Sequence, residues 1–292
     1  MGLGISLVMS CFNRTHLFRM TYPTWFLGNP QHPTRTPPDE ILIINDGGAT
    51  DLVAAVQDME KMIAELGYDI PVTYHHRDKG HTMWSNPAVP HNWLMKQAKG
   101  PIVLIIDPEV AFINDGLPLL HSYYNDHDYD GNHQDPLAER RRCSCSAGTT
   151  YAIQYEFMHA AGGIAVHDIP LRHEYISTDP TSHQIILRGG PAHEYRAWWK
   201  DRYIQIGGKD ERYVAWGYED LDIEHRNVRA HPGNPGQTRN ICDARITIVT
   251  YGHLLPPTTT GSESTGSNEY LWRTQSPEDG IANKGVEWGN IK

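Results

Sequence analysis

The stretch that decides the fold is PIVLIIDPE, residues 101–109. Its first part, 101–106, is the most apolar run in the chain, and such an uninterrupted run predicts a strand buried on both faces. Similar runs occur upstream as ISLVMS at 5–10 and EILIIN at 40–45, and a further strand, PVTYH, is expected at 71–75. Strands of this kind need cover on both sides, so helices must flank them.

Helical stretches separate the predicted strands. Residues 16–26 and 92–98 form two of them, and 52–66 is an amphipathic helix that Gly67 ends. Strands that alternate with helices are joined by right-handed crossovers, which produces a mostly parallel sheet. The sequence therefore predicts an α/β fold with a mostly parallel central sheet flanked by helices. No G-x-G-x-x-G follows the first strand and no Walker motif is present, so a dinucleotide cofactor is not expected.

Polar loops follow three of the predicted strands, at residues 11–15, 45–51 and 107–109. In open α/β sheets the ligand crevice lies outside the carboxyl ends of the strands. Each loop taken alone could be an ordinary turn. Because all three fall at strand ends, we expect them to share one cleft.

A second acidic stretch, WGYEDLD at 216–222, lies about a hundred residues further along and begins a helix. Carboxylates are favoured there because a helix N-terminus carries partial positive charge. Trp216 can form a flat wall for a ring-shaped ligand, and Gly217 lets a ligand approach the backbone. The alternative is an N-capped surface helix with a buried tryptophan.

Composition narrows the class of protein. The 292 residues carry a net charge of −10 with histidine neutral, which disfavours binding through a broad basic face. The cysteines contain no C-x-x-C pair, as expected for a reduced, cytoplasmic protein. No signal peptide is recognisable, and no apolar run approaches the roughly 18 residues of a membrane span.

The remaining regions carry weaker patterns. Arg140–Arg142 is most simply a solvated face, with a phosphate or acceptor contact as the alternative. Trp198-Trp199 is expected in the core rather than as a platform for a sugar. Further strands are expected at 151–158 and 246–250. The Thr-, Ser-, Gly- and Pro-rich stretch 256–268 predicts a flexible tail or lid.

Taken in order, these motifs resemble the GT-A glycosyltransferases of the family 2 type, and the C-terminal part is similar to the β-1,4-galactosyltransferases. The segments that carry the resemblance are ISLVMSCFNR, IINDGGATD, HNWLMKQAKG, VLIIDPE and GGKDERYVAWGYEDLDIEHR. They cover roughly residues 4–115 and 203–255. The resemblance implies a Rossmann-like, single catalytic domain with a nucleotide-sugar-binding half at 1–115, an acceptor-binding half at 116–255, and a C-terminal tail or lid at 256–292.

The chain departs from the family pattern at several places. Glu109 replaces the second aspartate of the metal motif, and the segment 78–90 has lost much of the usual glycine-rich spacing. Tyr218 stands where a second glycine is common, which would narrow the acceptor pocket. Residues 116–200 match no family motif, although this region would shape the acceptor site.

The resemblance implies a role for each motif residue. The donor would be bound by Cys11, Asn13, Arg14, Asp46, Asn92 and Asp107. Mn²⁺ or Mg²⁺ would be held by Asp107, Glu109 and His253. Asp220 would be the general base, and the acceptor would be bound by Trp216, Gly217 and Glu219.

The implied function is an inverting, metal-dependent transfer of a sugar from a nucleoside-diphosphate sugar to an acceptor hydroxyl. A UDP-sugar is favoured over a GDP-sugar, and the acceptor could be a glycan, a protein, a metabolite or a modified nucleic-acid base. One displacement from the opposite face inverts the anomeric carbon, as in inverting hydrolases. Two alternatives stay open: a nucleotidyltransferase of related fold, whose usual basic opening loop is missing here, and a non-catalytic carbohydrate-binding or virion structural domain.

Overall fold

The structure is a computed structural model. It describes residues 2, 4–28, 35–48, 51–78, 87–112, 114–126, 137–146, 149–153, 186–188, 195–214, 217–230, 238–240, 247–251 and 261–291. Trp216 and His253, two residues expected in the site, lie outside these ranges, as do residues 154–158 of an expected strand.

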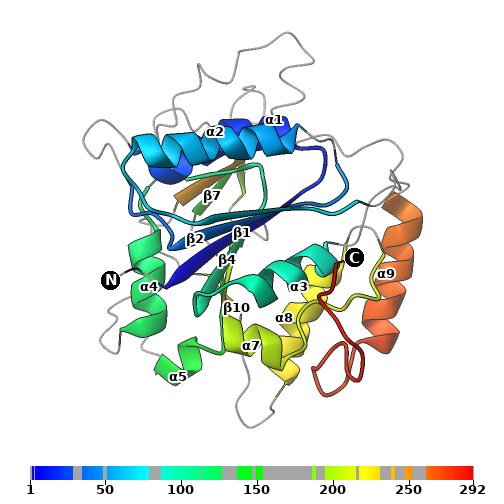
Figure 1. Cartoon of the computed structure of the whole chain (residues 1–292). Coiled ribbons are helices and arrows are strands. Elements are labelled where there is room, and N and C mark those ends of the chain that lie inside the picture. The colour runs from blue at the N-terminus through cyan, green and yellow to red at the C-terminus, as the bar shows by residue number, and fades with distance from the viewer. Residues whose placement is uncertain are drawn as a thin grey trace.

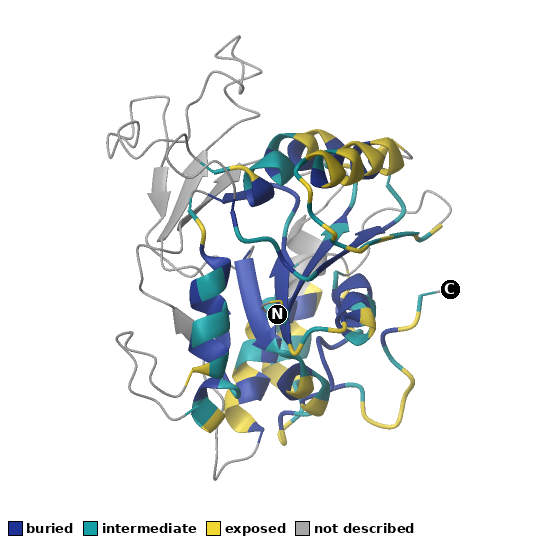
Figure 2. Ribbon diagram, turned by 60° about the vertical axis from the view of Figure 1, so that its left-hand side comes forward, coloured by how far each residue is buried: buried dark blue, intermediate teal, exposed yellow. Residues whose placement is uncertain are grey.

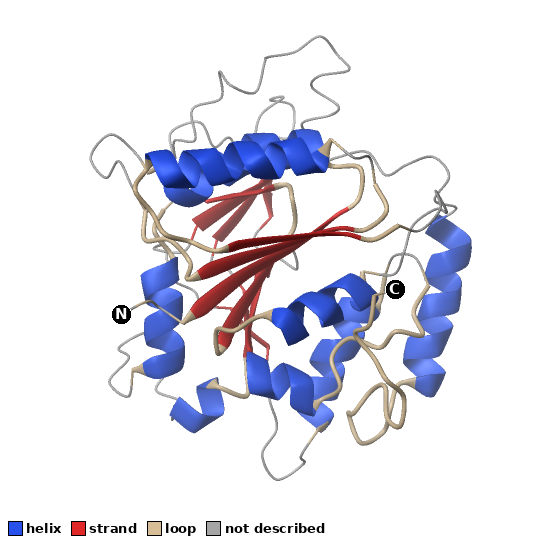
Figure 3. Ribbon diagram, in the orientation of Figure 1, coloured by secondary structure: helices blue, strands red, loops and turns tan. Residues whose placement is uncertain are grey.

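A seven-stranded sheet with the order β10-β6-β9-β4-β1-β2-β3 forms the centre of the molecule (Figure 3). Its parallel part consists of β1 (Ile5–Cys11), β2 (Glu40–Asn45), β3 (Val72–His76) and β4 (Ile102–Ile106). The four strands predicted from apolar runs therefore lie side by side and parallel, as expected. β9 (Tyr195–Trp199) continues the sheet antiparallel to β4, and β6 (Ser144–Ser146) and β10 (Thr238–Asn240) complete it.

Helices cover both faces of this sheet, which is why the strands are apolar on both sides. α1 (Thr15–Phe26) and α2 (Leu52–Glu65) lie on one face, and α3 (Ala88–Gln97), α7 (Lys200–Gln205) and α8 (Glu219–Arg229) lie on the other (Figure 1). Alternate residues of β1 supply the two faces: Leu7 packs in the α1–α2 cluster and Val8 in the α3–α7–α8 cluster. The mostly parallel α/β class predicted from the sequence is confirmed.

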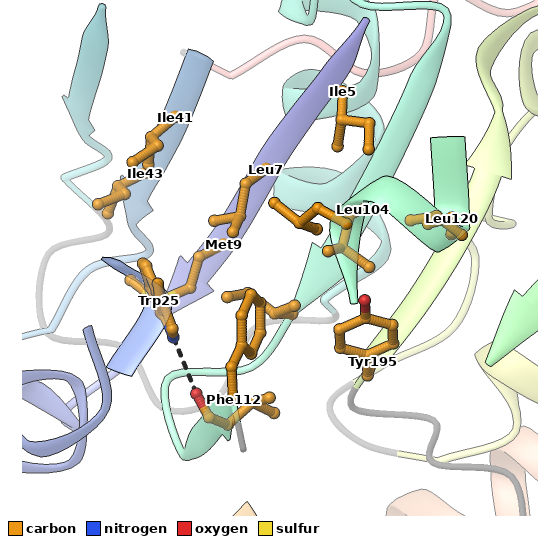
Figure 4. Close-up of a cluster of buried hydrophobic side chains, with 14 of the residues drawn as sticks. Ile5, Leu7, Met9, Trp25, Ile41, Ile43, Leu104, Phe112, Leu120 and Tyr195 are labelled. Carbon is orange, nitrogen blue, oxygen red and sulfur yellow. Dashed lines mark hydrogen bonds between the residues drawn. The ribbon is translucent and has the colours of Figure 1, made fainter. Parts of the chain in front are cut away.

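The α1–α2 side of the sheet is closed by aromatic residues. Trp25 of α1 donates a hydrogen bond from Nε1 to the carbonyl oxygen of Val110 at 2.9 Å, and its ring lies 6.3 Å from that of Phe112 (Figure 4). Both partners belong to β5 (Val110–Phe112), which begins directly after Glu109. A second sheet of four strands joins β5 to β11 (Thr247–Tyr251), β7 (Thr149–Ile153) and β8 (Ile186–Arg188).

The central strands and the outer faces of the helices differ in solvent exposure. The central strands are buried along their length, whereas α2 exposes its outer side (Figure 2). α4 (Leu117–Asn125) and the single-turn α5 (Leu137–Arg140) flank the sheet, and α4 contributes Tyr123 and Tyr124 to the core. No helix in the described ranges is long and apolar enough to cross a membrane.

Two stretches differ from what their composition indicated. The stretch 256–268 was expected to be a flexible tail or lid; residues 256–260 lie outside the described ranges, and from Gly261 the chain forms α9 (Gly261–Gln275). Asn268 fixes this helix, because its side chain exchanges hydrogen bonds of 2.8 and 3.1 Å with both backbone groups of Val214. The run Arg140–Arg142 was expected to be solvated, yet Arg140 is buried. Arg141 lies 4.2 Å from the centre of the Trp199 ring, and all three arginines donate to backbone carbonyls.

Smaller differences concern single elements. α3 begins at Ala88, four residues before the predicted start, and Pro90 fits there because the first turn of a helix needs no N–H donors. Trp198 is buried, as predicted for a core residue, while Trp199 is only partly buried.

Candidate functional site

The loops that follow β1 and β2 touch each other. The backbone N–H of Asp46 donates to the carbonyl oxygen of Cys11 at 2.9 Å. Gly48 lies so close to the next turn that a Cβ there would come within 2.7 Å of the Asn13 nitrogen. Asn13 itself has a φ of 54°, the left-handed conformation that asparagine tolerates better than most residues. The first two polar loops therefore form one continuous surface.

Arg14 connects this surface to the end of β4. Its Nη1 donates to both carboxylate oxygens of Glu109, at 2.9 and 3.1 Å, and only 5% of the Glu109 side chain is exposed. Burial alone would lower the pKa of Arg14, but the charges of Glu109 and Asp107 outweigh it and raise that pKa. On the other side, Arg77 donates to Asp46 at 3.1 Å. All three expected loops thus meet at one edge of the sheet.

Asp107 and Glu109 are the expected metal ligands of this edge, and their hard carboxylate oxygens suit Mn²⁺ or Mg²⁺. In kind they fit such an ion, and Asp107 is partly exposed. Both oxygens of Glu109 accept hydrogen bonds from Arg14, so a metal at Glu109 would share this carboxylate with Arg14 or displace it. Within the described ranges, no three His, Cys, Asp or Glu side chains are placed so that they could hold a metal ion together.

Two residues that were expected to bind the sugar donor, Cys11 and Asn92, have buried side chains. Cys11 is buried in the core, and burial raises the pKa of its thiol to about 12, so only its backbone faces the loops. Asn92 is buried as well, and its amide group makes four hydrogen bonds. Nδ2 donates to Lys209 O and Glu211 Oε1, while Oδ1 accepts from Tyr203 and from Lys209 N. This geometry argues against a direct contact between Asn92 and the sugar donor, because the side-chain amide of Asn92 has no hydrogen-bonding capacity left.

The acidic helix start lies at the beginning of α8. Gly217 has a φ of 105° and Tyr218 a φ of 68°, so the chain turns through two left-handed residues before the helix begins at Glu219. The side chain of Asn268 holds this turn by donating to the Gly217 carbonyl at 3.0 Å. A tyrosine in this conformation is strained, because its Cβ crowds the backbone.

The two carboxylates of this helix start differ in environment. Glu219 is 4% exposed, and its Oε2 makes no hydrogen bond to the described part of the chain. Burial raises the pKa of Glu219 to about 7, helped by the charge of Asp220 and opposed by that of Lys209. The side chain of Asp220 is 39% exposed and lies 2.6 Å from the Lys209 ammonium.

A chain of polar contacts links Asp220 to β1. Lys209 Nζ lies 2.9 Å from Nδ1 of His91, whose Nε2 lies 3.0 Å from the Ser10 hydroxyl. An ammonium group has only donors, so Nδ1 of His91 accepts and Nε2 carries the proton. Burial, reinforced by Lys209, lowers the pKa of His91 well below its ordinary value and keeps the ring neutral.

This chain of contacts places the two acidic stretches at the same edge of the sheet. Met9 of β1 lies opposite Ile106 of β4, so Ser10 is level with Asp107 on the neighbouring strand. The start of α8 reaches Ser10 through Lys209 and His91. Sequence reasoning missed both linking residues. Lys209 had one signal, its position directly after the glycine pair 207–208, while nothing distinguished His91 among 17 histidines.

No protein-family model matches the chain, and no curated protein matches it. Solved structures are similar in fold. GalNAc-T7, in a crystal structure with UDP, GalNAc and Mn²⁺, has 15% identity and a TM-score of 0.54 over 92% of this chain and 47% of its own. The Pyrobaculum calidifontis mannosyltransferase PcManGT, with GDP-Man and Mn²⁺, has 12% identity and a TM-score of 0.46 over 93% and 61%. S. aureus TarS has 11% identity and a TM-score of 0.49 over 85% and 36%.

At such identities the likeness concerns the fold alone, and of these three structures GalNAc-T7 has a TM-score above 0.5. The chain spans less than two thirds of each of these three proteins. Its fold is the GT-A fold of glycosyltransferases. The similarity of the C-terminal part to β-1,4-galactosyltransferases stays a prediction.

Proposed function

We propose that the chain is an inverting, metal-dependent glycosyltransferase that moves a sugar from a nucleoside-diphosphate sugar to an acceptor hydroxyl. One observation carries this proposal: a GT-A fold brings Asp107 and the carboxylates of the α8 start, far apart in the sequence, to one edge of the sheet. Transfer of the sugar needs acidic groups in two places. One set holds the metal on the donor's phosphates, and the other takes the proton from the acceptor hydroxyl.

In this proposal the donor lies on the loops after β1, β2 and β4. Asp46 contacts the nucleoside, with Asn13, Arg14 and Asp107 beside it. A UDP-sugar is the preferred donor, and the UDP and Mn²⁺ in the GalNAc-T7 structure support that choice. Asp107 and Glu109 would hold Mn²⁺ or Mg²⁺ with His253 as a third ligand, and such an ion stabilises the negative charge that builds up on the leaving diphosphate.

The acceptor lies at the start of α8. Asp220 is the proposed general base, because its carboxylate is partly exposed and close to the Lys209 ammonium. Glu219, Trp216 and Gly217 would bind the acceptor. A base on the side of the sugar opposite the diphosphate makes transfer a single displacement, which inverts the anomeric carbon.

The test is a panel of nucleotide sugars incubated with the purified chain and Mn²⁺, with hydrolysis and transfer followed by nucleotide release. We expect release from one nucleotide sugar, and loss of that release in EDTA. Nucleotide release that persists in EDTA would remove the metal from the proposal. Pyrophosphate formation from a nucleoside triphosphate and a sugar phosphate would favour a nucleotidyltransferase, and no turnover of any donor would favour a binding domain.

A further inference from the structure

Lys209 is a buried lysine that the proposed donor and acceptor contacts do not include. Only 5% of its side chain is exposed, and a buried ammonium is costly unless charges and hydrogen bonds compensate for it. Ionisable groups face it from three helices: His91 of α3, Tyr203 of α7, and Glu219 and Asp220 of α8. Burial alone would lower the pKa of Lys209, but Asp220 and Glu219 outweigh it, so the side chain stays charged.

The backbone around Lys209 is fixed on both sides. Its N–H donates to Asn92 Oδ1 at 2.9 Å, and its carbonyl accepts from Asn92 and Asn283 at 2.8 Å each. The two preceding glycines have φ values of 77° and 66°, where any side chain would be strained, and a Cβ on Gly207 would come within 2.1 Å of the Ala282 carbonyl. The C-terminal segment therefore helps to hold Lys209 in place.

The Lys209 ammonium contacts its two carboxylate neighbours differently. It contacts Asp220 at 2.6 Å, whereas Oε2 of Glu219 is buried without a hydrogen bond to the described residues. Adjacent carboxylates repel, so the proton that the pair can hold goes to the member with the weaker compensation. That member is Glu219.

We propose that Lys209 is a positioning residue that divides the carboxylate pair: its ammonium binds and orients Asp220 as the anion, while the buried carboxyl of Glu219 holds the proton of the pair. The catalytic consequence rests on the proposed function: Asp220 can then accept the acceptor's proton, and protonated Glu219 can donate a hydrogen bond to an acceptor oxygen. The division of the pair itself does not depend on any reaction.

The experiment titrates the pair directly in the full chain. Glu and Asp carboxyl carbons are labelled with ¹³C and followed by NMR from pH 4 to 9, with Glu219→Gln and Asp220→Asn used to assign the signals. We compare the unaltered chain with Lys209→Met, which removes the charge but keeps the length of the side chain. Lys200→Met is the matched control. The Lys200 ammonium also makes hydrogen bonds inside the protein, but it donates them to the backbone carbonyls of Lys96 and Ala98 and not to the carboxylate pair.

In the unaltered chain we expect the step near pH 7 to belong to Glu219. In Lys209→Met we expect the titration of Asp220 to move up by about 1–3 pH units, which is the pKa shift that a nearby opposite charge typically causes. Lys200→Met should leave both titrations in place. A step near pH 7 on Asp220, or an unchanged Asp220 titration in a folded Lys209→Met variant, would overturn the proposal.

A second readout is the pH profile of transfer. The acidic limb should shift upward in Lys209→Met by the same amount as the Asp220 titration, whereas a purely structural lysine would lower the rate equally at every pH. If Lys209→Met does not fold, the assignment of the pH 7 step in the unaltered chain still decides the matter. If the chain transfers no sugar at all, the proposed function fails while the carboxyl titration continues to test Lys209.

Discussion

Two cations, the partly buried Arg14 and the buried Lys209, lie at the same edge of the sheet, and each binds a carboxylate in a different way. Arg14 donates to both oxygens of Glu109, a side chain that is 5% exposed. Lys209 contacts one oxygen of Asp220, a side chain that is 39% exposed. Arg14 binds both oxygens of the buried Glu109, whereas Lys209 binds Asp220 while part of that carboxylate stays exposed to solvent. The difference teaches that a carboxylate's partner decides whether it is available for chemistry.

The largest effect should come from Asp107, the expected metal ligand that is partly exposed at the end of β4. We expect Asp107→Ala to abolish metal-dependent transfer, because the ion on the diphosphate loses its exposed ligand. Transfer and Mn²⁺ binding should be measured together with thermal unfolding. Asp58→Ala, at an exposed pair with Arg19, is the control and should keep full activity. Normal turnover of a folded Asp107→Ala variant would move the metal site elsewhere.

Asp220→Asn tests the accessible half of the comparison. The change keeps the shape of the side chain but removes the basic oxygen, and loss of a general base costs on the order of 10² to 10⁴ in rate. The KM for the sugar donor should stay nearly unchanged, because Asp220 is proposed to act on the acceptor. Glu219→Gln should mainly raise the KM for the acceptor. If Asp220→Asn only lowers the melting temperature slightly and transfer persists, the residue merely caps α8.

Arg14→Met tests the occupied half. If Arg14 competes with the metal for Glu109, its removal should tighten Mn²⁺ binding on the order of tenfold or more, since releasing a charge-assisted hydrogen bond no longer opposes binding. Isothermal titration with Mn²⁺ gives the affinity. The variant should also be less stable without metal, because Glu109 is then buried without its partner. Unchanged or weaker Mn²⁺ binding by a folded variant would show that Arg14 does not compete with the metal for Glu109.

The smallest effect concerns stability against pH. The folded-state pKa of Glu219 is raised to about 7, above its ordinary value of 4.5. Its contribution to stability is therefore fully present below about pH 4.5 and is lost as the pH rises through 7. Glu219→Gln cannot ionise, so it should gain stability relative to the unaltered chain between these values, measured by urea unfolding at pH 4.5 and 8. An equal difference at both pH values would place the Glu219 pKa near its ordinary range.

Much of the donor edge was predictable because it follows from local pattern. Apolar runs mark the parallel strands, and polar residues after them mark the loops that meet where those strands end. The pairing of Arg14 with Glu109 was not predictable in this way. It depends on where a flexible side chain from one loop finds a charge on another, 95 residues away.

The sequence by itself determined the α/β class, the parallel strands and the acidic start of α8, because these depend on apolar periodicity and on residue preferences within a few positions. Only the tertiary structure decided which acids are buried, which are partly exposed and which cation lies beside each. Lys209, His91 and Ser10 come from three distant segments, and only the folded chain links them to Asp220.

The same reason explains why two stretches differ from what their composition indicated. The stretch 256–268 has a composition typical of loops, yet α9 begins at Gly261 and Asn268 binds the turn before α8. Arg140 is a surface residue by type, yet it is buried and donates to a backbone carbonyl. Hydrogen bonds and burial supplied by distant residues outweigh local preferences of a few tenths of a kcal/mol per residue.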